Sequence, residues 1–166
     1  HGTSGGVTRA ADSAITLSVP DVIGQTEGTF FVEMTRTNVF ERFFVMLSAV
    51  AGTTANAYFN SVYLFQLPNG GFVADVWSGG SSQVASNTTA LSIGTHKLAI
   101  AYKQNDFAVY VDGVQRLVDT SGSVPAMNFL TIAGAVDGGD ARNILNQALL
   151  FKERLTNAEL ATLTTL

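Results

Sequence analysis

Hydrophobic and polar residues alternate over residues 94–113, and this alternation is the clearest structural signal in the chain. Large apolar residues occupy every second position in 98–102 and again in 107–111. A period of two places these side chains on one face of a β-strand. The polar residues 104–106 separate the two runs, and Asp112-Gly113 ends the second, where glycine accepts a positive φ at little cost. The pattern predicts two antiparallel strands joined by a short turn, followed by a second hairpin turn.

Similar short extended segments, separated by glycine-rich turns, run along most of the chain, and we predict about ten or eleven strands in all. The other segments are residues 14–19, 28–36, 43–51, 57–67 and 72–77, a weak strand near Val84 that leads to 91–94, and then 114–118, 129–133 and 144–151. Many short strands without intervening helices are typical of an all-β antiparallel sandwich rather than of a βαβ fold.

The last residues of the chain break this pattern and predict one short helix over 157–163. Thr156 and Glu159 have the spacing of a capping box, in which each side chain bonds to the other residue's backbone amide. Leu155 and Leu160 have the spacing of a hydrophobic staple across the same helix start. We expect this helix to pack on the sandwich as a lid, in a structural role.

The predicted strand at 43–51 is apolar on both faces, whereas an antiparallel strand normally has one solvated face. Phe43, Val45 and Leu47 alternate with Phe44 and Met46. Two explanations remain open. The strand is either a central one whose second face lies beneath long loops, or it forms a contact between subunits.

Length and charge narrow the class of protein. The chain has 166 residues, enough for one domain, with no cysteine and a net charge of −4. Its charged residues are few (13%) and form no basic cluster, so we expect no nucleic-acid partner. No apolar run is long enough for membrane insertion, and no signal peptide is visible. We expect residues 1–11 to be a linker or a remnant, and residues 12–166 to form the domain.

Several motifs then resemble one family. They are EGTFF at 27–31, KLAIAY at 97–102, the run from Phe107 to Gly113, LTIAG at 130–134 and RLTNAELATLT at 154–164. Together they resemble the concanavalin A-like, laminin G-like jelly roll, in particular the copies in tail fibres, spikes and decoration proteins of tailed bacteriophages. The resemblance covers roughly residues 12–165.

This resemblance implies a two-sheet jelly-roll sandwich with a short C-terminal helix, in a virion protein located on the particle surface. Members commonly bind glycans, other proteins or calcium through loops at one rim. A homo-oligomer would be natural there, and a trimer is the analogy from fibre tips. Many functions share this fold, however, so function must be argued from a site.

The sequence gives little support to catalysis. Retaining glycosidases need two carboxylates about 5–5.5 Å apart, but Glu33 and Asp75 each lack an acidic neighbour at i±2. A serine triad has little support because His96 is interpreted as a partly exposed strand residue. Zinc would need several His or Cys ligands, which the chain lacks. We therefore expect no enzyme activity and no cofactor.

Calcium is the one metal worth weighing. Asp137 and Asp140 supply oxygen ligands in a glycine-rich loop, as calcium prefers. Arg142 lies close by, and an ordinary loop closed by an Asp–Arg pair explains the same residues.

A glycan site needs an aromatic face against the sugar's C–H groups, together with polar groups for its hydroxyls. Trp77, the only tryptophan, is the first candidate for the aromatic face and Tyr58 the second. Alternatively, Trp77 packs in the core or against a neighbour. Tyr63, Tyr102 and Tyr110 are interpreted as sheet residues rather than ligand contacts. The candidates for the hydrogen bonds to the sugar are Asp75, Asn87, Asp137 and Arg142.

Two functions follow from these features. The first is a non-enzymatic phage module that binds host-surface carbohydrate. The second is a structural virion protein, a capsid decoration or a fibre-tip domain, that contacts other virion chains.

Overall fold

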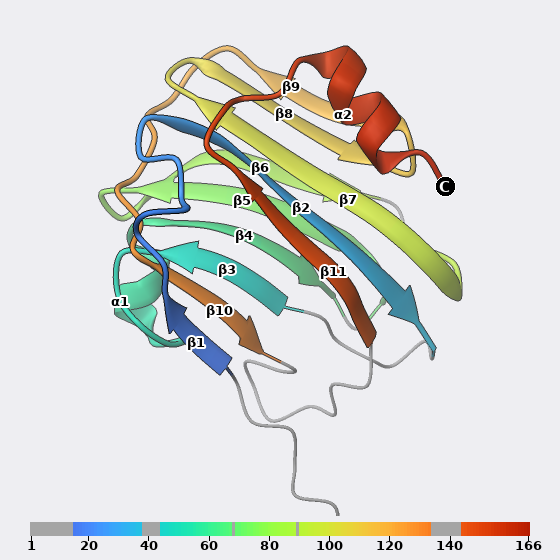
Figure 1. Cartoon of the computed structure of the whole chain (residues 1–166), viewed down its shortest axis with the longest axis horizontal. Coiled ribbons are helices and arrows are strands. Elements are labelled where there is room, and N and C mark those ends of the chain that lie inside the picture. The colour runs from blue at the N-terminus through green and yellow to red at the C-terminus, as the bar shows by residue number, and fades with distance from the viewer. Residues whose placement is uncertain (1–14, 38–43, 68, 89, 134–143) are drawn as a thin grey trace, which may run out of the picture.

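A computed structural model describes residues 15–37, 44–67, 69–88, 90–133 and 144–166. Two antiparallel sheets stack face to face (Figure 1). The six-stranded sheet has the order β1-β10-β3-β4-β5-β6, and the five-stranded sheet has the order β11-β2-β7-β8-β9. This is the predicted jelly-roll sandwich. The predicted linker over residues 1–11 lies outside the described residues.

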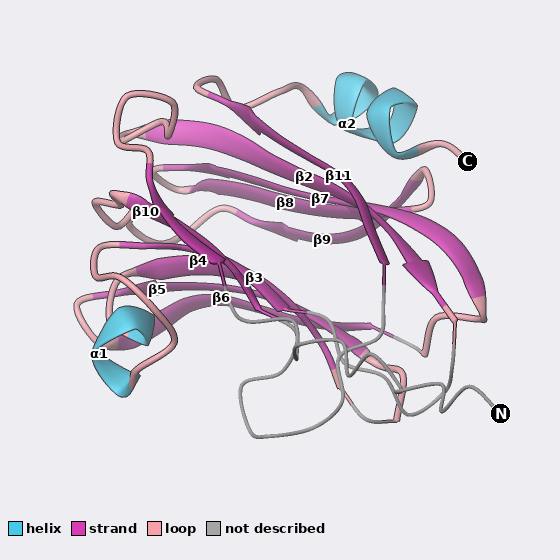
Figure 2. Cartoon of the chain, turned by 60° about the horizontal axis from the view of Figure 1, so that its bottom comes forward, coloured by secondary structure: helices cyan, strands magenta, loops and turns pink. Residues whose placement is uncertain are grey.

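The strands of the six-stranded sheet are β1 (Ile15–Ser18), β10 (Phe129–Ala133), β3 (Phe44–Ser48), β4 (Ser61–Gln66), β5 (Phe72–Ser78) and β6 (Ser81–Thr88). Those of the five-stranded sheet are β11 (Ile144–Phe151), β2 (Glu27–Arg36), β7 (Gly94–Lys103), β8 (Asp106–Val111) and β9 (Val114–Asp119). Two short helices, α1 (Ala55–Tyr58) and α2 (Asn157–Thr164), complete the described fold. Figure 2 shows α1 on the outer side of the six-stranded sheet and α2 on the outer side of the five-stranded sheet.

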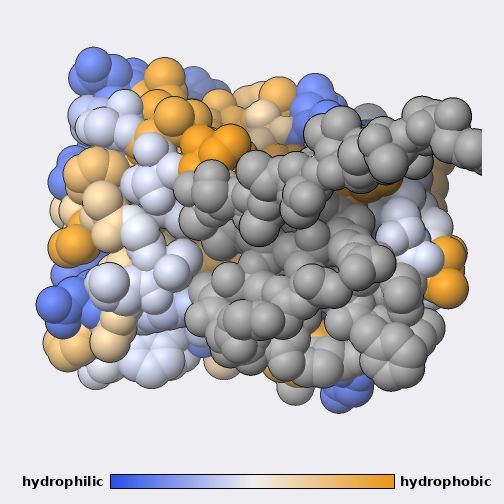
Figure 3. Space-filling view, turned by 90° about the horizontal axis from the view of Figure 1, so that it is seen from below, coloured by the Kyte–Doolittle hydropathy of each residue, from blue (hydrophilic) through white to orange (hydrophobic). Residues whose placement is uncertain are grey.

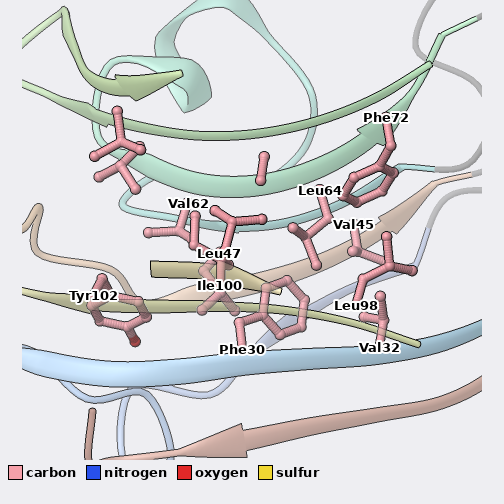
Figure 4. Packing of buried hydrophobic residues seen from close by; sticks show 14 of the residues in the cluster. Phe30, Val32, Val45, Leu47, Val62, Leu64, Phe72, Leu98, Ile100 and Tyr102 are labelled. Atoms are coloured by element: carbon pink, nitrogen blue, oxygen red, sulfur yellow. The ribbon is translucent and has the colours of Figure 1, made fainter. Parts of the chain in front are cut away.

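The core lies between the two sheets and follows from the alternation read in the sequence. Figure 4 shows side chains from both sheets meeting there, among them Phe30 and Ile100 from one sheet and Leu47 and Leu64 from the other. All four are fully buried. Side chains at every second strand position therefore point inward, and the positions between them form an outer face on each sheet.

The predicted hairpin is confirmed. β7 pairs antiparallel with β8 through a two-residue turn, where Asn105 has a φ of 57°. β8 pairs with β9 through Asp112 and Gly113, whose φ angles are 51° and 76°. Two consecutive positive φ angles are typical of a type I′ turn, whose twist matches that of the strands.

The predicted C-terminal helix is confirmed as α2, and it ends one residue later than expected. Both halves of the capping box are present: the Glu159 amide donates to Thr156 Oγ1, and the Thr156 amide donates to Glu159 Oε2. Leu160 is fully buried and Leu155 packs in the same cluster. The helix covers small residues on the outer face of the five-stranded sheet, among them Ala99 and Ala108.

The prediction of a single strand over 57–67 is wrong in its first part. Residues 55–58 form α1, and β4 begins only at Ser61. Residues 91–93 are likewise not a strand, and β6 is a full strand rather than a weak one. The full length of β6 follows from its pairing with β5, which a local pattern does not report.

The structure favours the first explanation for the doubly apolar strand. β3 is central, between β10 and β4. Val45 and Leu47 face the main core, while Phe44 and Met46 form a second cluster with Ala57 of α1. A helix of the same chain therefore covers the second face, in the connection between β3 and β4.

No helix in the described part of the chain is both long enough and apolar enough to cross a membrane.

Candidate ligand-binding face

The outer face of the six-stranded sheet carries a group of aromatic side chains around one carboxylate. Every second residue of β3, β4 and β5 packs in the core. Because successive side chains of a strand point to opposite faces, the residues between them face outward. We call this group the aromatic patch. It comprises Phe44 from β3, Tyr58 from α1, Tyr63 and Phe65 from β4, and Asp75 and Trp77 from β5.

The rings at the β3–β4 side of the patch enclose a small pocket of about 150 Å³ lined by Phe44, Tyr58, Tyr63 and Phe65. Phe44 is buried and lies against all three of the other rings, with centroid separations of 5.9 to 6.1 Å. Tyr58 and Tyr63 meet edge to face at 5.6 Å. These separations fall in the range of favourable aromatic pairs. The three partly exposed rings therefore have a fixed arrangement above a buried one.

Asp75 organises the other side of the patch. The Tyr63 hydroxyl and the Trp77 Nε1–H group both donate to Asp75 Oδ2, at 2.9 and 2.8 Å. The Ser82 hydroxyl donates to Oδ1 at 3.0 Å. Asp75 is only 6% exposed, and three donors offset the cost of placing its charge there. Tyr63 and Trp77 thus share one carboxylate oxygen. Asp75 therefore links the indole to the pocket lined by Phe44, Tyr58, Tyr63 and Phe65, which we call the tyrosine pocket.

Both tyrosine hydroxyls of the patch stay protonated at neutral pH. Burial raises the pKa of Tyr63, and the neighbouring Asp75 charge raises it further. Burial also raises the pKa of Tyr58. Phenol groups near neutrality therefore act here as hydrogen-bonding groups and not as charges.

Phe59, which follows Tyr58 in the chain, is a further exposed aromatic residue. Its ring is 55% exposed and lies over the β5–β6 turn, where a Cβ atom on Gly80 would come within 2.6 Å of Phe59 Cε1. The Gly79 amide donates to Asn60 Oδ1, and the Gly80 amide donates to the Phe59 carbonyl. The turn and the α1–β4 connection thus fix each other at this end of the sheet.

The structure brings three of the six predicted glycan-contact residues together. Trp77 is partly exposed on the outer face rather than packed in the core. Trp77 donates a hydrogen bond to Asp75, which also accepts one from Tyr63. The Tyr63 ring in turn contacts the ring of Tyr58. The backbone of Asn87 pairs with Val73 in the same sheet, but the Asn87 side chain lies outside the described residues. Asp137 and Arg142 also lie outside them, as does the predicted calcium pair Asp137 and Asp140.

Four members of the surface were missed by sequence reasoning: Tyr63, Phe44, Phe65 and Ser82. The alternation of residues 61–66 carried a signal for Tyr63 and Phe65, since both lie on the face opposite to Val62 and Leu64. No local signal pairs Tyr58 with Tyr63, because that contact requires the helical turn that replaces the predicted strand. Tyr102 and Tyr110 lie in β7 and β8 of the other sheet, so both are sheet residues as predicted, and both are buried.

The prediction that His96 is a partly exposed strand residue is wrong, since the residue is buried, with 5% of its surface exposed. Its Nδ1 lies 2.7 Å from Asp112 Oδ2, and its Nε2 lies 2.9 Å from the Ser92 carbonyl oxygen and 3.5 Å from Ser92 Oγ. The order Ser–His–Asp resembles a catalytic triad. However, Nε2 makes its shorter contact with a backbone carbonyl oxygen, which accepts a hydrogen bond and is not a nucleophile that the imidazole could activate. The group therefore ties the residue 92 loop to the β8–β9 turn.

Carboxylates are sparse at the candidate face. Asp75 is the only acidic residue within the six strands of its sheet as the structure bounds them. Glycoside hydrolysis by the usual route needs a pair. Among the described residues, no three His, Cys, Asp or Glu side chains group as metal ligands.

Other surfaces of the described chain have fewer features of a ligand-binding site. A recess beside α2 is lined mainly by apolar side chains such as Phe151, Leu155 and Leu163. In Figure 3, which looks at the molecule from below, hydrophobic and hydrophilic residues are interspersed over the coloured part of that face. Within the described residues, the aromatic patch alone combines several aromatic rings with a buried carboxylate network.

Solved structures resemble this chain in fold. The sequence matches no protein-family model and no curated protein. A CBM40 domain of the Ruminococcus gnavus IT-sialidase aligns with a TM-score of 0.63 at 10% identity, over 93% of this chain and 95% of that one. A galectin of Caenorhabditis elegans aligns with a TM-score of 0.55 at 13% identity, over 84% and 91%.

The sialidase of Trypanosoma rangeli aligns with a TM-score of 0.59 at 18% identity over 83% of this chain. The match spans only 22% of the sialidase. At these identities the likeness establishes the fold alone. The chain therefore has the jelly-roll sandwich fold seen in lectin-like and CBM40 domains.

Proposed function

We propose that this chain is a non-enzymatic carbohydrate-binding domain whose ligand lies on the aromatic patch. The observation that carries the proposal is the shared Asp75 carboxylate, which joins the Trp77 indole to the tyrosine pocket. Following the family resemblance of the sequence, we further propose that the domain belongs to a phage virion and binds host-surface glycan. A galectin and a CBM40 domain, both carbohydrate-binding classes, share the fold and support the coarser proposal.

The geometry suits a sugar for a physical reason. A pyranose ring has an apolar C–H face that covers an aromatic ring, and a rim of hydroxyls that needs hydrogen-bonding partners. Trp77 offers a partly exposed indole whose orientation is fixed by its bond to Asp75. Tyr58 offers a hydroxyl for which the structure gives no partner among the described residues. Asn87, Asp137 and Arg142 remain predicted contributors at the rim.

Such a shallow site binds weakly as a single copy. Several copies on one particle would raise the overall avidity, because each further contact becomes intramolecular. We propose that the virion supplies these copies, as a homo-oligomer or by repetition over its surface.

The test is a glycan array followed by calorimetric titration of the glycans that bind. We expect binding in the millimolar to micromolar range, a loss of at least roughly tenfold for Trp77→Ala, and a smaller loss for Tyr58→Phe. Tyr110→Phe is the matched control, because it removes a tyrosine hydroxyl from the opposite sheet, where it donates to Gln115. Failure of every glycan to bind, or equal losses for the patch and control variants, would contradict the proposal.

A structural virion protein is the second candidate function, favoured by the edge strand β1. Ile15 and Leu17 of this strand are 53% and 47% exposed, although their partners Ile132 and Leu130 point toward the core side of the sheet. Exposed apolar side chains on an unpaired edge are a surface for strand addition by another chain. The response to glycans separates the two functions, since both allow an oligomer. This candidate predicts an oligomer that Leu17→Lys dissociates in a solution mass measurement, and no binding of any glycan.

A further inference from the structure

Asp75 accepts hydrogen bonds from most of the side-chain donors in and beside the aromatic patch. Trp77 has a single polar hydrogen, and it points to Asp75 Oδ2 at 2.8 Å. Tyr63 has a single polar hydrogen too, and it points to the same oxygen. Ser82, at the edge of the patch, donates its hydroxyl hydrogen to Oδ1. The Tyr58 hydroxyl is the one remaining side-chain donor within the patch as described.

What the patch then offers to a ligand is mostly acceptors. A hydroxyl whose hydrogen is committed keeps free lone pairs on its oxygen. This applies to Tyr63 and Ser82, and the Asp75 carboxylate has further lone pairs of its own. Apart from the bond that Tyr58 can donate, a ligand at the patch must therefore supply the hydrogens, as the hydroxyl groups of a sugar do.

The lack of Lys and Arg on the strands of this sheet favours the same kind of ligand, one that supplies hydrogens and carries no negative charge. The six strands, as the structure bounds them, contain one carboxylate, Asp75, and no Lys or Arg. The α1 segment 55–60 carries no charged residue either. A ligand carboxylate or sulfate has acceptors only, and at this surface it would meet other acceptors and a like charge.

We infer that the ligand of the aromatic patch is a neutral, hydroxyl-rich sugar, and that Asp75 excludes acidic sugars from it. This inference rests on the proposed function and deepens it. Asp75 acts in two ways: it fixes the donors of Tyr63, Trp77 and Ser82 away from the ligand, and its own charge repels an anionic group. It is a positioning residue, since the aromatic rings make the larger contact.

The test compares neutral glycans with acidic partners that differ by one group: the sialylated, sulfated or uronic-acid form of the same oligosaccharide. Binding is measured by calorimetry at low salt for the wild type, Asp75→Asn and Asp119→Asn. Asp119 is the matched control, because it is an exposed carboxylate on β9 that accepts from Ser121 and lies on the other sheet. The substitution therefore removes the same charge far from the patch.

We expect the neutral form to bind roughly tenfold or more tightly than its acidic partner, since like charges in contact are strongly unfavourable. Asp75→Asn should narrow this ratio, while Asp119→Asn should leave it unchanged. Equal or tighter binding of the acidic form, lost in Trp77→Ala, would overturn the inference and leave the proposed function standing. Failure of every glycan to bind would overturn both. A ratio that Asp75→Asn leaves unchanged would overturn the role of Asp75.

Discussion

At the scale of single residues, Asp75 determines the character of the candidate site. A carboxylate at 6% exposure is costly unless donors surround it, and three side chains meet this need. The same bonds set the orientation of the indole and of one tyrosine. Stability, and in the proposed function recognition as well, therefore depend on one residue, and its substitution should affect both.

Asp75→Ala should lower the free energy of unfolding by about 1–3 kcal/mol, because it leaves the Tyr63, Trp77 and Ser82 donors without their acceptor. Urea denaturation at pH 7 measures this change. Asp119→Ala is the control, and it should have a smaller effect because the bonds that its carboxylate accepts from Ser121 lie at the protein surface. Equal effects of the two substitutions would mean that the Asp75 network adds nothing to stability.

Gly28 is a second residue with a strict requirement. A Cβ atom there would overlap the Tyr102 hydroxyl, which donates to the Gly24 carbonyl at 3.2 Å, and would come within 3.0 Å of the Phe151 carbonyl oxygen. We expect Gly28→Ala to cost about 1–3 kcal/mol by overpacking. A double-mutant cycle with Tyr102→Phe should show coupling, since removing the hydroxyl relieves part of the overlap. Additive effects in the denaturation midpoints would contradict this contact.

At the scale of elements, the two helices perform the same task on opposite sides of the molecule. Each covers a strand face that the core does not use: α1 lies over Phe44 and Met46, and α2 lies over Ala99, Ala101 and Ala108. Only α2 was predictable, because a capping box and a staple mark its start. α1 has only four residues and no side-chain cap bond at Thr54, so its local sequence contains no signal that predicts a helix.

The capping box of α2 gives a prediction with a pH dependence. Bonds from the Thr156 hydroxyl and amide lower the pKa of Glu159 below its ordinary value of 4.5. A carboxyl group with a lowered folded-state pKa stabilises the fold above its unfolded pKa, and this contribution is lost as the pH falls through the folded pKa. Removing the Thr156 hydroxyl should therefore matter most at neutral pH.

Thr156→Ala should lower the free energy of unfolding by about 1 kcal/mol at pH 7. The difference in this free energy between the variant and the wild type should become smaller below pH 4.5. Urea denaturation at pH 7 and at about pH 3 measures both effects. Thr162→Ala in the same helix is the control, because that exposed hydroxyl only donates back to the Ala158 carbonyl. A difference that stays constant with pH would contradict the role assigned to Glu159.

At the scale of the whole molecule, the sequence was enough to predict the sandwich but only part of the site. Alternation, turn glycines and the capping box are local signals, and they predicted nearly every strand and α2. The site depends on neighbours far apart in sequence. Trp77 and Asp75 were found as polar and aromatic positions on one strand, whereas Tyr63 and Phe44 join them only through the register of β3, β4 and β5.

The interpretation of His96 failed for the same reason. Its environment is built by Asp112, sixteen residues away, and by a loop that adopts no strand. Alternation predicts which face a residue occupies, but it does not predict what covers that face. Both the aromatic patch and the His96 contacts depend on which residues cover a strand face, and the local pattern does not predict this.

The most direct test of the central claim uses the single tryptophan as a probe. In a ¹⁵N-labelled sample, Trp77 gives the only indole N–H signal, from the hydrogen that donates to Asp75. Titration with a neutral glycan selected on the array should shift this signal in a saturable manner, together with amides of β4 and β5, while amides of α2 stay unchanged. An unmoved indole signal at saturating glycan, or shifts confined to the five-stranded sheet, would contradict the account.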